Sequence, residues 1–267
     1  MDPCFIVSDL HMGDGSSSDD FKPNKRKFMG FLEHVKHQNG RLVLAGDVFE
    51  LWQAELQAIL KFNSEVIRLL FELQPMIIAG NHDFYLRTFA DFDFICYPAW
   101  HLRLPSGVVR IEHGNEYDPN NDPDRNMQMG KIVASIGGFA ENWIHPDIDM
   151  AFMEFLGKAR QVGNQVWDEI QTPWKKEKKS RKKQSNTSYV NAAARIIEED
   201  ETVRWVVFGH THNAEIRQEA HYANAGCWVK EYPTFVRVDE NSIGLYEFRA
   251  TDEIRVLDEA GFQWRTN

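Results

Sequence analysis

Short apolar runs alternate with longer amphipathic stretches through the first third of the chain. The runs at residues 5–7, 42–45 and 76–79 have the length of buried strands. The stretches at residues 24–37 and 56–73 carry apolar side chains at helical spacing. This β-α-β-α-β order predicts an α/β fold in which helices cover a sheet of parallel strands.

Five further apolar runs flank a long segment that has no strand-like run of its own. They are residues 108–111, 205–208, 221–229, 234–238 and 243–248, and they predict strands. Residues 115–200 instead carry apolar positions at helical spacing, and 189–199 predict a helix that leads back into the core. We expect one domain over residues 1–267, with 115–200 as a mostly helical insertion that caps a site.

A polar cluster follows each of five predicted strands. The clusters are DLH at 9–11, GD at 46–47, GNHD at 80–83, HG at 113–114 and GHTH at 209–212. Ligand sites in open α/β sheets assemble at the carboxyl ends of strands, so these clusters are expected to meet. Side chains two residues apart at a strand end point the same way, which lets Asp9 converge with His11 and His210 with His212.

Seven side chains in these clusters are of metal-ligand type, and none is a cysteine. They are Asp9, His11, Asp47, Asn81, His113, His210 and His212. Oxygen and nitrogen donors suit divalent Mn, Fe or Zn, and Mn²⁺ is the expected ion. Seven donors overfill one ion, but they suit two ions about 3.5–4 Å apart that share a carboxylate and clamp a phosphoryl group. D-x-H alone is typical of a surface turn; the five clusters together indicate a two-metal centre.

The clusters resemble the signature of the calcineurin-like metallophosphoesterase superfamily: D-x-H, GD-x-x-[DE], GNH[DE], His-Gly and GHxH. Glu50 completes the second block, and the match covers nearly the whole chain. The resemblance implies a four-layer α/β/β/α sandwich of two mixed sheets with a helical cap and a dinuclear site. It implies one ion on Asp9, His11, Asp47 and His212, and a second on Asp47, Asn81, His113 and His210. A hydroxide between the ions would be the nucleophile that attacks phosphorus.

His82 and Asp83 are the expected catalytic residues of the GNHD cluster. The resemblance implies that His82 is not a ligand but lies beside the metals, hydrogen-bonded to a carboxylate. There it would stabilise the phosphoryl oxygens or protonate the leaving group. Asp83 is the expected orienting partner, with Asp47 and Glu50 as alternatives.

A narrower resemblance concerns the substrate. Residues 8–11, 46–52, 83–84 and 222–229, with the helical insertion, are similar to UDP-2,3-diacylglucosamine pyrophosphohydrolases of lipid A synthesis. That family uses the insertion as a lid over acyl chains at the inner membrane surface, but commonly has Arg in place of His82. The implied substrate is a UDP-sugar lipid such as UDP-2,3-diacylglucosamine. The alternatives are a soluble nucleotide or phosphoprotein substrate, and a non-catalytic scaffold, against which the complete ligand set argues.

Composition bears on the cellular compartment and the partners of the protein. The three cysteines are widely scattered without a C-x-x-C pair, which is typical of reduced thiols in a cytoplasmic protein. No apolar stretch approaches the roughly 18 residues of a membrane span, and no signal peptide is recognisable. The formal charge of −10 disfavours nucleic acid as a partner. The basic run at 175–183 is expected to be a solvated loop, with peripheral contact to an anionic membrane as the alternative.

Overall fold

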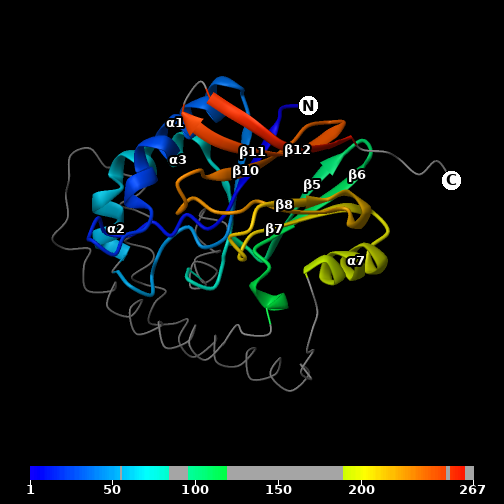
Figure 1. The fold of residues 1–267 in the computed structure, drawn as a ribbon, viewed down its shortest axis with the longest axis horizontal. Coiled ribbons are helices and arrows are strands. Elements are labelled where there is room, and N and C mark those ends of the chain that lie inside the picture. The colour runs from blue at the N-terminus through cyan, green and yellow to red at the C-terminus, as the bar shows by residue number, and fades with distance from the viewer. Residues whose placement is uncertain (55, 84–95, 119–188, 251–252, 262–267) are drawn as a thin grey trace, which may run out of the picture.

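A seven-stranded mixed sheet forms one half of the fold in the computed structural model, which describes residues 1–54, 56–83, 96–118, 189–250 and 253–261 (Figure 1). Its strand order is β12-β11-β10-β1-β2-β3-β4. The strands are β1 (Cys4–Val7), β2 (Arg41–Ala45), β3 (Met76–Ile78), β4 (Cys96–Tyr97), β10 (Thr234–Val238), β11 (Ser242–Ala250) and β12 (Glu253–Gly261). Strands β1 to β4 run parallel to one another, and β10 to β12 add an antiparallel edge that begins at the β1–β10 pair.

A five-stranded mixed sheet, in the order β5-β6-β7-β9-β8, forms the other half. Its strands are β5 (Ala99–Leu104), β6 (Gly107–Glu112), β7 (Val203–Phe208), β8 (Glu215–Arg217) and β9 (Tyr222–Asn224). Strands β6, β7 and β9 are parallel, while β5 and β8 pair antiparallel at the two edges. The strand predicted at 221–229 is shorter, because the chain turns after Asn224 through Gly226, whose φ is +76°.

The α-helices within the described residues are α1 (Lys25–His37), α2 (Leu56–Phe62), α3 (Ser64–Leu73) and α7 (Tyr189–Glu199), and short 3-10 turns cover Lys22–Asn24, Asn115–Tyr117 and Gln218–Ala220. The single helix predicted at 56–73 is interrupted at Asn63. The buried amide of Asn63 donates to the carbonyl oxygens of Gly13 (2.8 Å) and Ile59 (2.9 Å). An asparagine side chain that bonds nearby backbone in this way competes with regular helix.

Alternating side chains of the strands divide the core into layers. Phe5 and Val7 of β1 pack with α1, α2 and α3, whereas Cys4 and Ile6 join a second apolar cluster with Val207 of β7. A third cluster joins the outer face of the five-stranded sheet to α7. Helices therefore cover the outer face of each sheet (Figure 1), and the expected α/β/β/α sandwich of two mixed sheets is confirmed.

Part of the expected insertion at 115–200 can be followed. The helix predicted at 189–199 is α7, and residues 115–118 follow β6. Residues 119–188 lie outside the described residues, and so does the basic run at 175–183, so the cap stays a prediction. Among the helices that are described, none combines the length and the apolar character that crossing a bilayer requires.

Candidate metal centre

The five polar clusters lie in the loops that follow β1, β2, β3, β6 and β7, which we call the ligand loops. Backbone hydrogen bonds tie these loops to one another. The amide of Asp9 donates to Gly46 O (3.0 Å) and that of Gly209 to His113 O (3.0 Å), while Trp228 N donates to Asp9 O (3.0 Å). Strand ends that are far apart in sequence are thereby fixed at one edge of the sandwich.

Five of the predicted ligands have a left-handed backbone. Their φ values are 54° at Asp9, 48° at His11, 51° at Asp47, 67° at His210 and 55° at His212. Such conformations are uncommon outside glycine and cost on the order of 1–3 kcal/mol each, so they persist only where surrounding structure imposes them. This concentration of strain at the ligand loops is the behaviour of a functional site.

Two glycines make room for the ligands. A Cβ atom on Gly80 would overlap Asp47 Oδ1, and one on Gly46 would overlap the imidazole of His113. Gly46 also has a φ of +92°, a backbone conformation that residues with a side chain rarely adopt. Any larger residue at either position would displace a predicted ligand.

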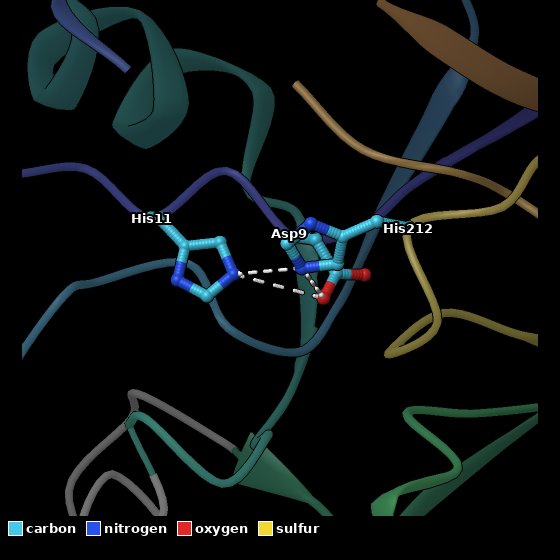
Figure 2. Close-up of side chains that lie close together, drawn as sticks. All are labelled: Asp9, His11 and His212. Carbon is cyan, nitrogen blue, oxygen red and sulfur yellow. Dashed lines mark hydrogen bonds and ion pairs between the residues drawn. The ribbon is translucent and has the colours of Figure 1, made fainter. Parts of the chain in front are cut away.

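Asp9, His11 and His212 form the first group of donors (Figure 2). His11 Nε2 lies 3.2 Å from His212 Nε2, and Asp9 Oδ1 lies 3.1 Å from His212 Nε2 and 3.8 Å from His11 Nε2. Asp9 Oδ1 is buried without a hydrogen bond to any described residue. Two imidazole nitrogens and an orphaned carboxylate oxygen aimed at one point fit a cation between them.

Asp47, His113 and His210 form the second group. His113 Nε2 lies 3.2 Å from Asp47 Oδ2 and 3.3 Å from Asn81 Oδ1, which brings the asparagine to the same group. Asp47 Oδ2 is also 3.9 Å from His11 Nε2, in the first group. The Asp47 carboxylate therefore stands between the two groups, where a bridging ligand belongs.

The outer ring nitrogens of His11 and His113 are occupied by hydrogen bonds. His113 Nδ1 donates to Ala45 O (2.9 Å) and His11 Nδ1 to Glu50 Oε2 (2.9 Å). A carbonyl or carboxylate oxygen can only accept, so these partners place the proton on Nδ1 and leave the Nε2 lone pair for the site. Such hydrogen bonds fix the tautomer and orientation of metal-binding histidines.

Charge in this buried edge is balanced between carboxylates and imidazoles. Burial alone would raise the pKa of Asp9, but the imidazoles of His11 and His212 outweigh it and hold that pKa well below its usual range. Burial alone would lower the pKa of His11, but Asp9 and Glu50 raise it to about 11. The carboxylates thus demand positive charge, which divalent cations can supply in place of protons.

His82 lies beside the two groups and pairs with Glu50. Its Nδ1 is 2.9 Å from Glu50 Oε1, and its ring stands perpendicular to that of His11 at 4.6 Å. Burial alone would raise the pKa of Glu50, but hydrogen bonds from His11 and His82 lower it to about 2. One carboxylate therefore holds both a predicted ligand and the predicted catalytic histidine.

Asp83, expected as the partner that orients His82, bonds to backbone amides in the structure. The fully buried Asp83 accepts from Val48 N (2.6 Å) and Gly80 N (2.7 Å), and so ties the loop after β2 to the loop after β3. Burial, followed by the charge of Asp47, raises its pKa to about 6. Neighbours in sequence point in different directions at a strand end. Asp83 therefore joins the two loops, and the carboxylate in hydrogen-bonding distance of His82 is that of Glu50, one of the two alternatives.

Asp118 is a further residue of the site; its place just after the His113 motif suggested contact with a substrate phosphate, not with a predicted ligand. Its Oδ2 atom lies 3.0 Å from Nε2 of His210. That pairing leaves Nδ1 of His210 as the nitrogen available to a metal, the reverse of the arrangement at His11 and His113. The only signal in the sequence is an acidic residue five positions after His113.

Comparison with known proteins identifies relatives that are phosphoesterases or related hydrolases. The family model described as calcineurin-like phosphoesterase matches residues 3–214. A UDP-2,3-diacylglucosamine hydrolase from Porphyromonas gingivalis (strain ATCC BAA-308 / W83) is 24% identical over 120 residues, which are 42% of this chain and 45% of that protein. The aligned part thus spans less than half the length of this curated relative.

Solved structures share the architecture at low sequence identity. A dimetal phosphatase from Danio rerio superimposes with a TM-score of 0.50 at 11% identity, covering 96% of this chain and 98% of its own. Vacuolar protein sorting 29 from Cryptosporidium parvum gives a TM-score of 0.47 at 13% identity, covering 97% and 98%. At 11% identity the likeness to the phosphatase concerns the fold alone.

Proposed function

The chain belongs to the calcineurin-like phosphoesterase family, and on that premise we propose that it is a metal-dependent hydrolase of phosphate ester or pyrophosphate bonds. The observation that carries the proposal is the shared carboxylate of Asp47, which lies 3.2 Å from His113 Nε2 and 3.9 Å from His11 Nε2. Two donor groups joined by one carboxylate are the arrangement that a dinuclear centre requires.

The donors divide between the two groups as follows. Asp9, His11 and His212 would hold one ion, Asn81, His113 and His210 the other, and Asp47 both. When bound, two divalent ions would supply an acidified water and positive charge against the phosphoryl oxygens. Mn²⁺ is the proposed ion, with Fe and Zn as alternatives that suit the same oxygen and nitrogen donors.

His82 would handle protons or charge at the leaving oxygen. Its Nδ1 is committed to Glu50, so Nε2 is the ring atom that can donate. A positioned imidazole of this kind typically contributes about 10²–10⁴-fold to rate as a general acid. The Glu50 carboxylate supports the cationic ring that such a transfer needs.

The proposed substrate is a UDP-sugar lipid such as UDP-2,3-diacylglucosamine, met by a cytoplasmic protein peripheral to the membrane. Support comes from the 24% identity to the Porphyromonas gingivalis hydrolase of that name and from the motif at 46–52. His82 stands where that family commonly has Arg. A soluble nucleotide or phosphoprotein substrate is the second candidate, favoured by this histidine.

A direct assay separates these candidates. Purified protein loaded with Mn²⁺ is given UDP-2,3-diacylglucosamine in detergent micelles, an aryl phosphodiester and an aryl phosphomonoester. We expect release of UMP from the lipid, and none after Asp47→Asn. Hydrolysis of the aryl esters without lipid turnover would move the substrate to the soluble class. Metal binding without turnover of any phosphate compound would favour a non-catalytic scaffold.

A further inference from the structure

The indole of Trp52 lies flat against the imidazole of His82. The two ring centroids are 3.6 Å apart and the ring planes are inclined by only 21°. Aromatic pairs in proteins more often have centroids about 4.5–7 Å apart in offset or edge-to-face arrangements. The close parallel stack therefore restrains the orientation of the His82 ring.

Glu50 and Trp52 restrain the ring of His82 in different directions. The hydrogen bond from Nδ1 to Glu50 Oε1 (2.9 Å) fixes one atom in the ring plane. A single hydrogen bond still allows the imidazole to tilt about that contact. The indole face opposes the tilt, because the ring could turn only by running into Trp52.

Both restraints come from one short turn. Glu50 O accepts from Gln53 N (3.3 Å) and Ala54 N (3.2 Å), and Trp52 N donates to Glu50 Oε1 (3.3 Å). Glu50 N donates to Met12 O (3.1 Å), which anchors the turn to the ligand loop after β1. The turn that begins just after Asp47 is thus built to present an acceptor and an aromatic face to the same imidazole.

We propose that Trp52 is a positioning residue that keeps His82 aligned with the leaving oxygen, an inference that rests on the proposed function. Loss of the stack lowers kcat because fewer rings stand in the productive orientation, and it leaves KM nearly unchanged. The loss is larger for poor leaving groups, which depend most on proton donation, than for good ones, which depart unaided.

The test compares Trp52→Leu, Trp52→Phe, His82→Ala and the double variant on the Mn²⁺-loaded enzyme. The substrates are aryl phosphodiesters with a phenol or a 4-nitrophenol leaving group. We expect Trp52→Leu to lower kcat about tenfold on the phenyl ester and less on the nitrophenyl ester, with KM within about twofold. Trp52→Phe should restore most of the rate, and Trp52→Leu should add no loss to His82→Ala.

Trp100→Leu is the matched control, because Trp100 is a partly buried tryptophan of β5 whose ring packs on Tyr97 at 5.2 Å. It should leave both rates unchanged. Equal losses on the two esters, a further loss in the His82→Ala background, or a rise in KM alone would overturn the proposal. A rise in KM alone would assign Trp52 to substrate contact.

A second readout does not depend on turnover. Proton NMR of the protein loaded with diamagnetic Zn²⁺, with the His82 ring signals assigned by their loss in His82→Ala, reports the stack through the shielding by the indole. We expect Trp52→Leu, and not Trp100→Leu, to shift those signals downfield. Unchanged signals would refute the stack itself, whereas the expected shift in a protein without phosphoesterase activity would refute only the proposed function.

Discussion

The ligand loops and the aromatic core beneath α1 lie next to each other but differ in the kind of residue that they bury. The aromatic core consists of Phe5, Phe28, Phe31, Trp228, Phe235 and Phe248, all buried with ring centroids 4.8–6.1 Å apart in the contacting pairs. The ligand loops instead hold buried carboxylates, close imidazoles and left-handed backbone. Burial of apolar surface in the aromatic core stabilises the fold. That stability offsets the cost of the strained backbone that holds the donors of the ligand loops in place.

The two regions meet at Trp228. Its indole packs in the aromatic core at 4.8 Å from Phe28, while its backbone amide donates to Asp9 O (3.0 Å). Asn24, at the start of α1, donates to Trp228 O and Lys230 O, both at 2.8 Å. Damage to the loops should therefore remove activity, and damage to the core should remove stability.

The largest effect is expected from Asp47→Asn. The substitution removes the charge that both donor groups share, so kcat should fall about a thousandfold or more, as when an essential catalytic group is removed. Hydrolysis of an aryl phosphodiester with excess Mn²⁺ measures the loss, and circular dichroism confirms the fold. The control Asp258→Asn changes an exposed carboxylate of β12. Activity retained in Asp47→Asn would place the chemistry elsewhere.

Phe31→Ala should destabilise the aromatic core. Phe31 contacts five aromatic rings of the core, and its truncation should lower the free energy of unfolding by about 3–5 kcal/mol. Urea unfolding measures this change, with Phe31→Leu as a milder control. The folded fraction should keep the wild-type kcat. A lower kcat at full folding would show that the core shapes the site directly.

Glu50→Gln tests how much the site depends on a residue that orients the proposed ligands without binding the metal itself. One neutral amide oxygen cannot accept from His11 and His82 as the carboxylate does at 2.9 Å. We expect a loss of about 10–100-fold in Mn²⁺ affinity or activity, the scale for residues that orient metal ligands. Isothermal titration with Mn²⁺ and steady-state kinetics separate the two. The exposed Glu219→Gln should change neither, and a wild-type result for Glu50→Gln would remove its supporting role.

Asn24→Ala should have the smallest effect, because it acts only where the regions meet. It leaves the carbonyls of Trp228 and Lys230 without their donor, which should cost about 1–3 kcal/mol of unfolding free energy. Mn²⁺ affinity should fall by less than in Glu50→Gln. Asn241→Ala, at an exposed turn, is the control. Affinity lost as strongly as in Glu50→Gln would mean that the core sets the ligand geometry.

The sequence predicted the parts of the fold that periodicity controls. β10 and α7 have the predicted limits, because their apolar positions follow a strand or helix period throughout. β12 was missed because it is an exposed edge strand in which charged residues interrupt the apolar ones, so that no apolar run is longer than two residues. The break at Asn63 was missed because its amide bonds Gly13, fifty residues away in the chain.

The proximity of the proposed ligands could be predicted from the sequence, but the residues that support them could not. Each donor follows an apolar strand directly, so topology alone brings Asp9, His11 and Asp47 together. The partner of His82 is Glu50, which lies 32 positions away and is reached only through the folded turn. The left-handed backbone of the ligands also has no signature in residue type, since tertiary hydrogen bonds impose it.

The stoichiometry of bound Mn²⁺ tests the central claim most directly, which is that seven donors form a two-ion centre with His82 outside it. Wild type and His82→Ala are dialysed against Mn²⁺, and the metal per chain is measured by elemental analysis. We expect two ions per chain in both proteins, with kcat lowered about 10²–10⁴-fold in the variant. One ion per chain in wild type, or the loss of an ion in His82→Ala, would contradict this account.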